Sequence, residues 1–195
     1  GAGDKVVILS SSMPNWGVSY FAVTTAGMIA VPILPDFTSS ELDLIIEHSE
    51  AKAILVSDKL YAKLSKEVIE KFNIVIRTKG LNSIVKRVSE RAEKRIPQPD
   101  DIAAIIYTSG TTSKPKGVML THKAISMQLS VIPPLFEYNQ DDVLLSILPL
   151  SHTYECTLGL LLIFSGGGRM TYLEKPPTPS VLLPALRKVR PTIFL

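Results

Sequence analysis

Residues 105–122, IIYTSGTTSKPKGVMLTH, concentrate groups that can hold an anion. The stretch carries six Ser and Thr hydroxyls and two glycines, and two lysines flank its proline. Hydroxyls and backbone N–H groups can converge on a phosphate where a loop follows a buried strand and precedes a helix, which is the placement predicted here. The same composition is typical of a flexible surface linker. Composition alone therefore leaves a linker and a phosphate-binding loop open.

The loop does not follow the pattern of the P-loop nucleotide hydrolases. That pattern needs a second glycine five residues after the first, followed by lysine and a hydroxyl residue. Counting from Gly110, the fifth position is Pro115, and no Gly-Lys-Ser or Gly-Lys-Thr run follows. A phosphate bound here is therefore held in a different manner.

The order of residues resembles a known signature. Residues 107–118, YTSGTTSKPKGV, resemble the phosphate-binding signature of the adenylate-forming superfamily, which includes acyl-CoA synthetases, peptide-synthetase adenylation domains and luciferases. Residues 148–155, LPLSHTYE, are similar to an element of the acyl-CoA synthetase branch, particularly of members that take fatty acids. Residues 26–32, AGMIAVP, are similar to the family's glycine-containing helix end before an apolar strand. The resemblance covers nearly the whole chain in the family's order.

The resemblance implies a reaction in two steps. A carboxylate attacks the α-phosphorus of ATP to give an acyl-adenylate and pyrophosphate, and the sulfur of CoA then displaces AMP. A carboxylic acid with a pKa of about 4 is already ionised at neutral pH, so the first step needs no general base. It needs in-line positioning and neutralisation of charge on the leaving pyrophosphate, which donors, lysine and Mg²⁺ supply. The expected function is ATP-dependent activation of a fatty acid to acyl-CoA.

The resemblance also implies roles for individual residues. Lys116 and His152 are the expected catalytic residues, with Lys116 on the phosphates and His152 forming a wall between the acyl pocket and the adenylate. Thr108 is expected beside Mg²⁺, and Gly117 is expected to turn the chain toward its next element. The expected nucleotide-binding set is Thr108, Ser109, Gly110, Thr111, Thr112, Ser113, Lys116 and Gly117.

Ser113 departs from the family pattern. Most members carry glycine at this position, and a left-handed backbone there would cost a serine about 1–2 kcal/mol. Because serine keeps a hydroxyl in the loop, we interpret the change as tuning of the loop.

Three potential metal ligands follow one another in the second motif. His152 lies three residues before Glu155 and four before Cys156, so one helix face could carry all three. The sequence supplies no further His or Cys cluster, which argues against zinc. The alternative for His152 is a helix-start residue bonded to backbone. Glu155 is expected to orient a neighbour and Cys156 to lie in the core, whereas His48 and His122 are expected to be structural.

Composition and charge exclude several classes. At 195 residues, with 46% hydrophobic and 20% charged residues, the chain is long and apolar enough for a folded core. The basic cluster in residues 86–95 has no interleaved aromatic residue, which argues against nucleic acid as a partner. A single cysteine and no secretory signal indicate a reducing, cytoplasmic setting. Residues 6–35 are uncharged but broken by Ser, Gly, Pro and Asn, so they predict no transmembrane segment.

Small molecules are the expected partners: ATP, a fatty acid and CoA. Peripheral contact with a membrane surface is left open, and the sequence indicates no oligomeric state.

Hydrophobic periodicity predicts alternating strands and helices. The expected strands cover residues 5–9, 29–34, 53–56, 74–76, 102–107, 143–148, 169–173 and 192–195. The expected helices cover residues 15–27, 39–49, 59–71, 82–94, 121–135, 154–165 and 180–189. Thr38 and Glu41 are spaced as a capping box, and Leu42, Ile45 and Ile46 would line the buried side of their helix.

This alternation predicts an α/β fold with mostly parallel, helix-flanked sheets. Residues 1–96 are expected to form a first α/β segment and residues 97–195 a second one that carries the phosphate-binding loop. By resemblance, both belong to one partial N-terminal AMP-binding domain, whose adenine, ribose and CoA contacts lie outside this chain. The 195 residues alone are therefore not expected to turn over. Two alternatives stay open: a non-catalytic nucleotide-binding or interaction module, and an adenylating enzyme for a different carboxylic acid.

Overall fold

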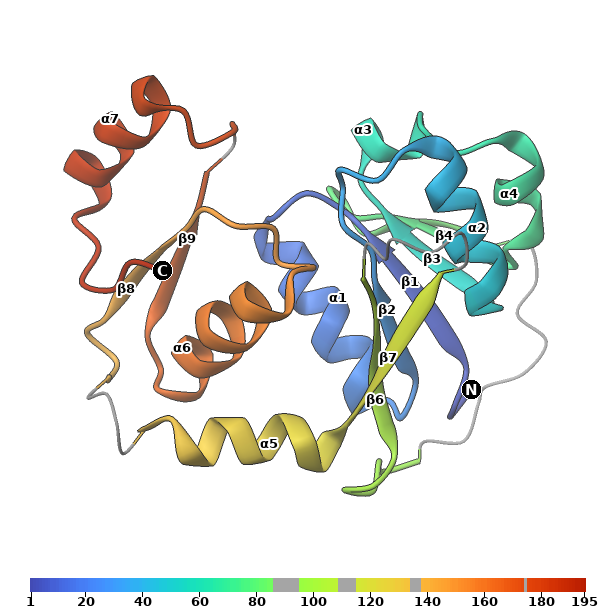
Figure 1. The fold of residues 1–195 in the computed structure, drawn as a ribbon, viewed down its shortest axis with the longest axis horizontal. Helices are drawn as coiled ribbons and strands as arrows, with labels where there is room; N and C mark the ends of the chain where they lie inside the picture. The colour runs from blue at the N-terminus through green and yellow to red at the C-terminus, as the bar shows by residue number, and fades with distance from the viewer. Residues whose placement is uncertain (86–94, 109–114, 134–137, 174) are drawn as a thin grey trace. The chain divides into compact units, whose positions relative to one another are not determined.

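The computed structural model describes residues 1–85, 95–108, 115–133, 138–173 and 175–195 (Figure 1). They belong to two compact units. The first unit comprises Gly1–Ser11 and Asn15–Lys123, and the second comprises Ser12–Pro14 and Ala124–Leu195. The chain thus passes from the first unit to the second after Lys123, and the division expected at residue 96 stays a prediction.

A mostly parallel sheet forms the centre of the first unit. Its strands are β1 (Lys5–Leu9), β2 (Ile29–Pro32), β3 (Ala53–Val56), β4 (Ile74–Arg77), β5 (Asn82–Val85), β6 (Ile102–Thr108) and β7 (Lys116–Thr121). Within the described residues the strand order is β5-β4-β3-β1-β2-β6-β7. The five central strands run parallel, whereas β5 and β7 pair antiparallel at the two edges. The predicted α/β fold with a mostly parallel sheet is confirmed.

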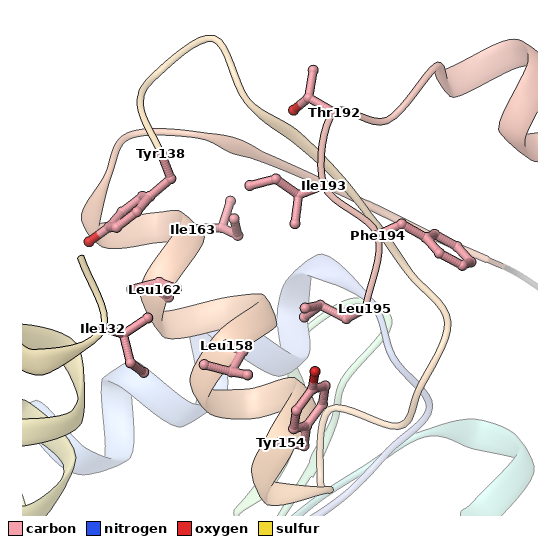
Figure 2. Close-up of a pocket in the computed structure, with 10 residues that line it drawn as sticks. All are labelled: Ile132, Tyr138, Tyr154, Leu158, Leu162, Ile163, Thr192, Ile193, Phe194 and Leu195. Atoms are coloured by element: carbon pink, nitrogen blue, oxygen red, sulfur yellow. The ribbon is translucent and has the colours of Figure 1, made fainter. Parts of the chain in front are cut away.

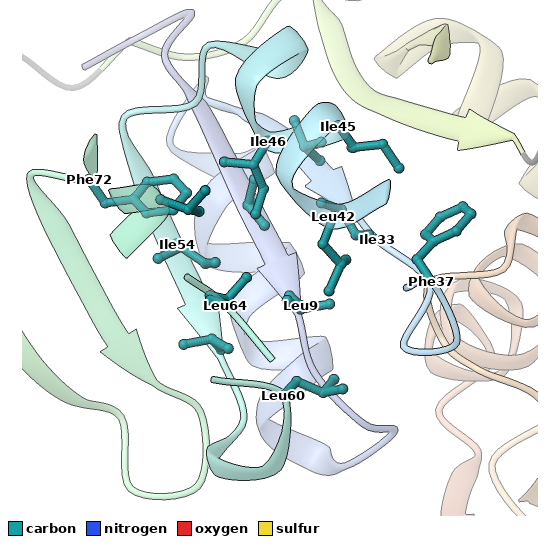
Figure 3. Packing of buried hydrophobic residues seen from close by; sticks show 14 of the residues in the cluster. Leu9, Ile33, Phe37, Leu42, Ile45, Ile46, Ile54, Leu60, Leu64 and Phe72 are labelled. Atoms are coloured by element: carbon teal, nitrogen blue, oxygen red, sulfur yellow. The ribbon is translucent and has the colours of Figure 1, made fainter. Parts of the chain in front are cut away.

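Helices cover both faces of this sheet (Figure 1). They are α1 (Pro14–Thr25), α2 (Ser39–Ser49), α3 (Asp58–Tyr61) and α4 (Lys66–Lys71). Val7 of β1 packs in a cluster with Leu42, Ile45 and Ile46 of α2 (Figure 3). Its neighbour Ile8 points to the opposite face and is equally buried. Burial on both faces explains why β1 is a continuous apolar run.

The start of α2 is fixed by the predicted capping box. The Thr38 hydroxyl accepts a hydrogen bond from the backbone N–H of Glu41 at 3.3 Å. The Glu41 carboxylate in turn accepts from the backbone N–H of Thr38 at 2.8 Å. Such a cap stabilises a helix by about 0.5–2 kcal/mol, and here it sets the face that buries Leu42, Ile45 and Ile46.

The helix predicted over residues 59–71 is two short helices, α3 and α4. The chain leaves the helical path after Tyr61, and Ser65 begins α4 by accepting a hydrogen bond from the N–H of Val68 at 3.2 Å. A serine hydroxyl stabilises a helix N-terminus better than a helix interior. The hydrophobic periodicity runs on through Ser65, so it predicted one helix where the serine in fact begins a second one.

Two strands replace segments that were predicted to be helix or loop. Residues 82–85 are β5, which pairs with β4, and not the start of a charged helix; residues 86–94 of that prediction lie outside the described residues. Residues 116–121 are β7, so the helix α5 (His122–Val131) begins only after this strand. In both cases pairing with a sheet edge overrode the local pattern.

The second unit holds a smaller parallel pair, β8 (Val143–Ser146) and β9 (Arg169–Tyr172). Between them lie a π-helix, η2 (Glu155–Leu161), and α6 (Leu162–Ser165), which confirm the helix predicted there. The helix α7 (Pro179–Val189) follows. The strand predicted over residues 192–195 is reduced to one isolated bridge between Ile193 and Leu144.

None of the helices in the described part of the chain is both long and apolar enough to cross a bilayer.

Candidate active site

The predicted phosphate-binding loop connects the antiparallel strands β6 and β7. Thr108 at the end of β6 is the register partner of Lys116 at the start of β7, and Tyr107 is the partner of Gly117. The loop therefore joins two strands and does not lead from a strand into a helix, which corrects that part of the prediction. Residues 109–114 lie outside the described residues. The predicted ligands Ser109, Gly110, Thr111, Thr112 and Ser113 fall among them.

Thr108 and Lys116 form the mouth of this hairpin. Residues directly opposite each other in an antiparallel pair project on the same face, so the hydroxyl and the ammonium lie side by side. Both residues are exposed. Among the described residues, no carboxylate forms an ion pair with Lys116. The mouth of the hairpin therefore offers one positive charge and one hydroxyl to an incoming anion.

Gly117 serves close packing and does not turn the chain. It lies inside β7, and its φ is not in the left-handed region. A Cβ atom at this position would lie 2.7 Å from Cγ2 of Ile105 and 3.4 Å from Cζ of Tyr107. The glycine thus leaves room for the side chains of Ile105 and Tyr107 on the neighbouring strand, which corrects the predicted reason for this residue.

Tyr107 is anchored from the other direction by His48. The Tyr107 hydroxyl and Nδ1 of His48, in the last turn of α2, are 2.8 Å apart, and the two rings meet edge to face. Burial, followed by the charge of Glu50, raises the pKa of Tyr107, which keeps its hydroxyl protonated. His48 is therefore structural, as expected, and it fixes the strand that leads into the loop.

The second motif forms the connection between β8 and η2. The Ser12 hydroxyl donates to the carbonyl of Leu148 at 3.3 Å and accepts from the N–H of Leu150 at 3.0 Å, so it brackets Pro149. The N–H of His152 donates to the carbonyl of Pro149 at 2.9 Å. The Ser12 hydroxyl thus acts as both donor and acceptor. Together with the bond from His152 to Pro149, three hydrogen bonds hold the turn that precedes His152.

His152 itself is exposed and bonded to nearby backbone. Its Nδ1 accepts from the N–H of Tyr154 at 3.3 Å, and its carbonyl accepts from the N–H of Cys156 at 2.9 Å. These bonds match the alternative of a helix-start histidine, and they engage Nδ1 while Nε2 is the outer nitrogen of an exposed ring. Cys156 is buried and forms no disulfide, as a core residue should.

Glu155 is a buried carboxyl group. Its side chain is fully shielded, and Oε1 lies 2.5 Å from the hydroxyl of Ser146. Burial raises its pKa, against the opposing effect of the Ser146 hydrogen bond. Burial, followed by the charge of Glu155, also raises the pKa of Tyr172 to about 12. In the described residues no three His, Cys, Asp or Glu side chains gather closely enough to hold a metal ion.

An apolar cavity of about 430 Å³ lies in the second unit (Figure 2). Leu158, Leu162 and Ile163 of the η2 and α6 helices line it on one side, and Ile193 and Leu195 line it on another. Tyr154 of the second motif also lines it, and the mostly apolar lining fits an apolar group.

The AMP-binding enzyme family matches residues 1–195, the whole length of the chain. The chain belongs to this family. It is 28% identical over 218 residues to long-chain-fatty-acid–CoA ligase 5 of Mus musculus, an alignment that covers 97% of the chain and 31% of that relative. It is 31% identical over 183 residues to 4-coumarate–CoA ligase 1 of Solanum tuberosum, covering 88% of the chain and 34% of that relative.

The fold is also that of solved members of the family. The long-chain-fatty-acid-CoA ligase FadD1 of Archaeoglobus fulgidus superposes with a TM-score of 0.79 at 26% identity, covering 99% of this chain and 39% of that one. The chain therefore spans about a third of the length of the relatives it matches.

Two residues that hold the second motif were not found by sequence reasoning. Ser12 precedes Leu148 by 136 residues, and Ser146 lies outside the Leu-Pro-Leu-Ser-His motif that it supports through Glu155. Neither serine belongs to a recognisable sequence pattern, so only the folded structure identifies them.

Proposed function

We propose that the full-length protein carrying this chain activates a fatty acid in two steps, first to an acyl-adenylate and then to acyl-CoA. The observation that carries the proposal is the pairing of Thr108 with Lys116. It places a hydroxyl, and an ammonium with no ion pair among the described residues, at the mouth of a hairpin whose loop has the family's phosphate-binding signature. The mouth of the hairpin therefore fits a triphosphate better than an apolar ligand.

The first step forms a bond between the acid's carboxylate oxygen and the α-phosphorus and breaks the bond to pyrophosphate. Lys116 would offset the charge that moves onto the leaving group, because an ammonium attracts one phosphate charge by up to about 4 kcal/mol at 4 Å and an effective dielectric of about 20, before desolvation is subtracted. Thr108 would orient the triphosphate and face Mg²⁺, which supplies further charge neutralisation when bound. In the second step the CoA sulfur bonds to the acyl carbon, and AMP leaves.

A fatty acid is supported by three observations. The motif that contains His152 resembles that of fatty acid-activating members, the cavity beside it is lined by apolar side chains, and long-chain ligases are among the similar proteins. A different carboxylic acid is the second candidate, favoured by the 31% identity to a 4-coumarate–CoA ligase. Binding of Mg²⁺ and CoA and a cytoplasmic location belong to the same proposal.

Acid-dependent exchange of labelled pyrophosphate into ATP tests the proposal on the full-length protein. A panel of fatty acids of increasing length, 4-coumarate and malonate should give exchange only with fatty acids. Exchange only with 4-coumarate or malonate would move the proposal to another acid. ATP binding without exchange for any acid would instead indicate the non-catalytic module.

Lys116→Ala should strongly lower the rate of exchange in the same assay. Lys123→Ala is the matched control, because Lys123 is an exposed lysine whose nearest carboxylate, Asp100, lies 3.9 Å away and such surface pairs contribute little. Equal loss in both variants would contradict a specific role for Lys116.

A further inference from the structure

The carboxyl group of Glu155 is buried in a way that needs an explanation. Its Oε1 is bonded to Ser146, but its Oε2 is shielded from solvent and has no hydrogen-bond partner among the described residues. A buried carboxyl with one unsatisfied oxygen costs free energy that a leucine or methionine at this position would not. Glu155 is therefore expected to have a role other than stabilising the fold.

The bond between Ser146 and Glu155 joins two element ends. Ser146 is the last residue of β8 and Glu155 is the first residue of η2, so the bond closes the eight-residue connection, residues 147–154, that carries His152. The next residue along η2, Cys156, donates its N–H to the carbonyl of His152. A shift of Glu155 away from β8 would therefore move His152 with it.

The surroundings of Glu155 are shaped to admit its carboxyl group. Gly159 lies one turn further along η2, and a Cβ atom there would lie 3.1 Å from Cδ of Glu155 and 3.2 Å from Cε of Met170. The helix is also a π-helix at this point, a rare form that is common at functional sites. Two local features thus agree in making room for one side chain.

We propose that Glu155, through its bond to Ser146, is a positioning residue that holds the His152 segment in place while the adenylyl group passes from ATP to the acid's carboxylate. The inference rests on the proposed function, and it adds two residues that do not touch the substrate. Glu155 sets how far η2 lies from the end of β8, and this distance sets where the outward nitrogen of His152 faces the reacting carboxylate. The carboxyl group of Glu155 thus holds the start of η2 at a set distance from Ser146.

Kinetics of the full-length protein test this role. Ser146→Ala and Glu155→Leu should lower kcat for acid-dependent pyrophosphate exchange by about 10- to 100-fold, the effect expected when a group is misplaced by about 1 Å. KM for ATP should stay within about twofold of wild type, because phosphate binding lies on the β6–β7 hairpin. Glu155→Gln keeps the length and an acceptor for the Ser146 hydroxyl, and it should restore most of kcat.

Ser165→Ala is the matched control. The Ser165 hydroxyl also donates a hydrogen bond on the same helical segment, to the carbonyl of Leu162 at 2.7 Å, but it does not join η2 to β8. Wild-type kcat in Ser165→Ala together with the losses above supports the proposal. Wild-type kcat in Ser146→Ala and Glu155→Leu overturns it, as does an equal loss in all three variants.

Hydrogen–deuterium exchange separates this inference from the proposed function. The amides of residues 151–156 should exchange faster in Ser146→Ala and Glu155→Leu than in wild type and Ser165→Ala. A wild-type protein that shows no exchange activity with any acid would remove the proposed function. Unchanged amide protection in an active protein would remove the positioning role alone.

Discussion

The β6–β7 hairpin and the β8–η2 connection treat charge in opposite ways. The hairpin leaves its ammonium exposed at Lys116, beside the hydroxyl of Thr108 and without an ion pair among the described residues. The connection instead buries its carboxyl, Glu155, next to helices that line an apolar cavity. An exposed charge is free to meet a charged ligand, whereas a buried one can only hold its surroundings in place. The comparison separates the hairpin, which we propose binds phosphate (the binding region), from the β8–η2 connection, which we propose aligns His152 (the aligning region).

Replacing Lys116 should have the largest effect and would break the comparison if it did not. We expect Lys116→Ala to lower kcat for pyrophosphate exchange by about 10²–10³-fold, similar to the loss of one donor at a developing charge. Raising the salt concentration should weaken ATP binding in wild type more than in the variant, because screening acts on the exposed charge. A wild-type rate in Lys116→Ala would show that the hairpin does not bind the leaving phosphates.

A methyl group at Gly117 should disturb the hairpin by packing alone. Since a Cβ atom would lie 2.7 Å from Cγ2 of Ile105, Gly117→Ala should destabilise the protein by about 1–3 kcal/mol. The measurement is the denaturant midpoint of the full-length protein.

The double variant Ile105→Ala with Gly117→Ala tests whether this clash causes the loss. Ile105→Ala removes Cγ2, the methyl group that the new Cβ atom would overlap. Its loss should be smaller than the sum of the two single losses. Strictly additive losses would place the cost of Gly117→Ala elsewhere.

Removing the Ser12 hydroxyl should loosen the aligning region. Ser12→Ala loses two hydrogen bonds around Pro149, each worth about 0.5–1.5 kcal/mol. We expect a smaller loss of kcat than for Lys116→Ala, with KM for ATP unchanged. Ser11→Ala is the control, because Ser11 is the exposed neighbour, and Ser12→Thr should retain activity. A loss in KM for ATP alone would assign Ser12 to the binding region.

The smallest effect concerns pH. Burial raises the pKa of Glu155 above its ordinary value of 4.5, so the folded protein keeps a proton at pH values where the unfolded chain has lost it. The free energy of unfolding should therefore fall as pH rises from the unfolded pKa through the folded pKa. Glu155→Gln should lack this fall, which denaturation at a series of pH values would show. Parallel curves for both proteins would mean that Glu155 ionises normally.

The local part of the fold could be predicted because its causes are local. The α2 helix begins and ends where predicted, since Thr38, Glu41 and the spacing of Leu42, Ile45 and Ile46 all lie within nine residues of one another. The hairpin was missed because Pro115, Lys116 and Gly117 have turn chemistry in sequence, whereas β7 exists through its pairing with β6.

The candidate sites divide in the same way. The loop was found because its signature is contiguous, although residues 109–114 lie outside the described residues and their roles stay predictions. The role of Ser12 depends on a contact across 136 residues, and no local pattern encodes it. The candidate binding groups were thus named from a motif and stay predictions, whereas the contacts of Ser12 became visible only in the folded structure.

The register of the β6–β7 pair has a consequence for how this loop can change. Side chains alternate between the two faces of a strand, so a register shift of one residue moves every side chain of β7 to the other face. The face on which Lys116 lies, opposite Thr108, is therefore set by the register of β6 and β7. A register shift of one residue would place Lys116 opposite Tyr107, or Gly117 opposite Thr108. A different residue in the loop, such as Ser113 in place of glycine, leaves that register untouched. The side on which Lys116 lies is therefore set by the pairing of β6 with β7, and not by which residue stands at position 113.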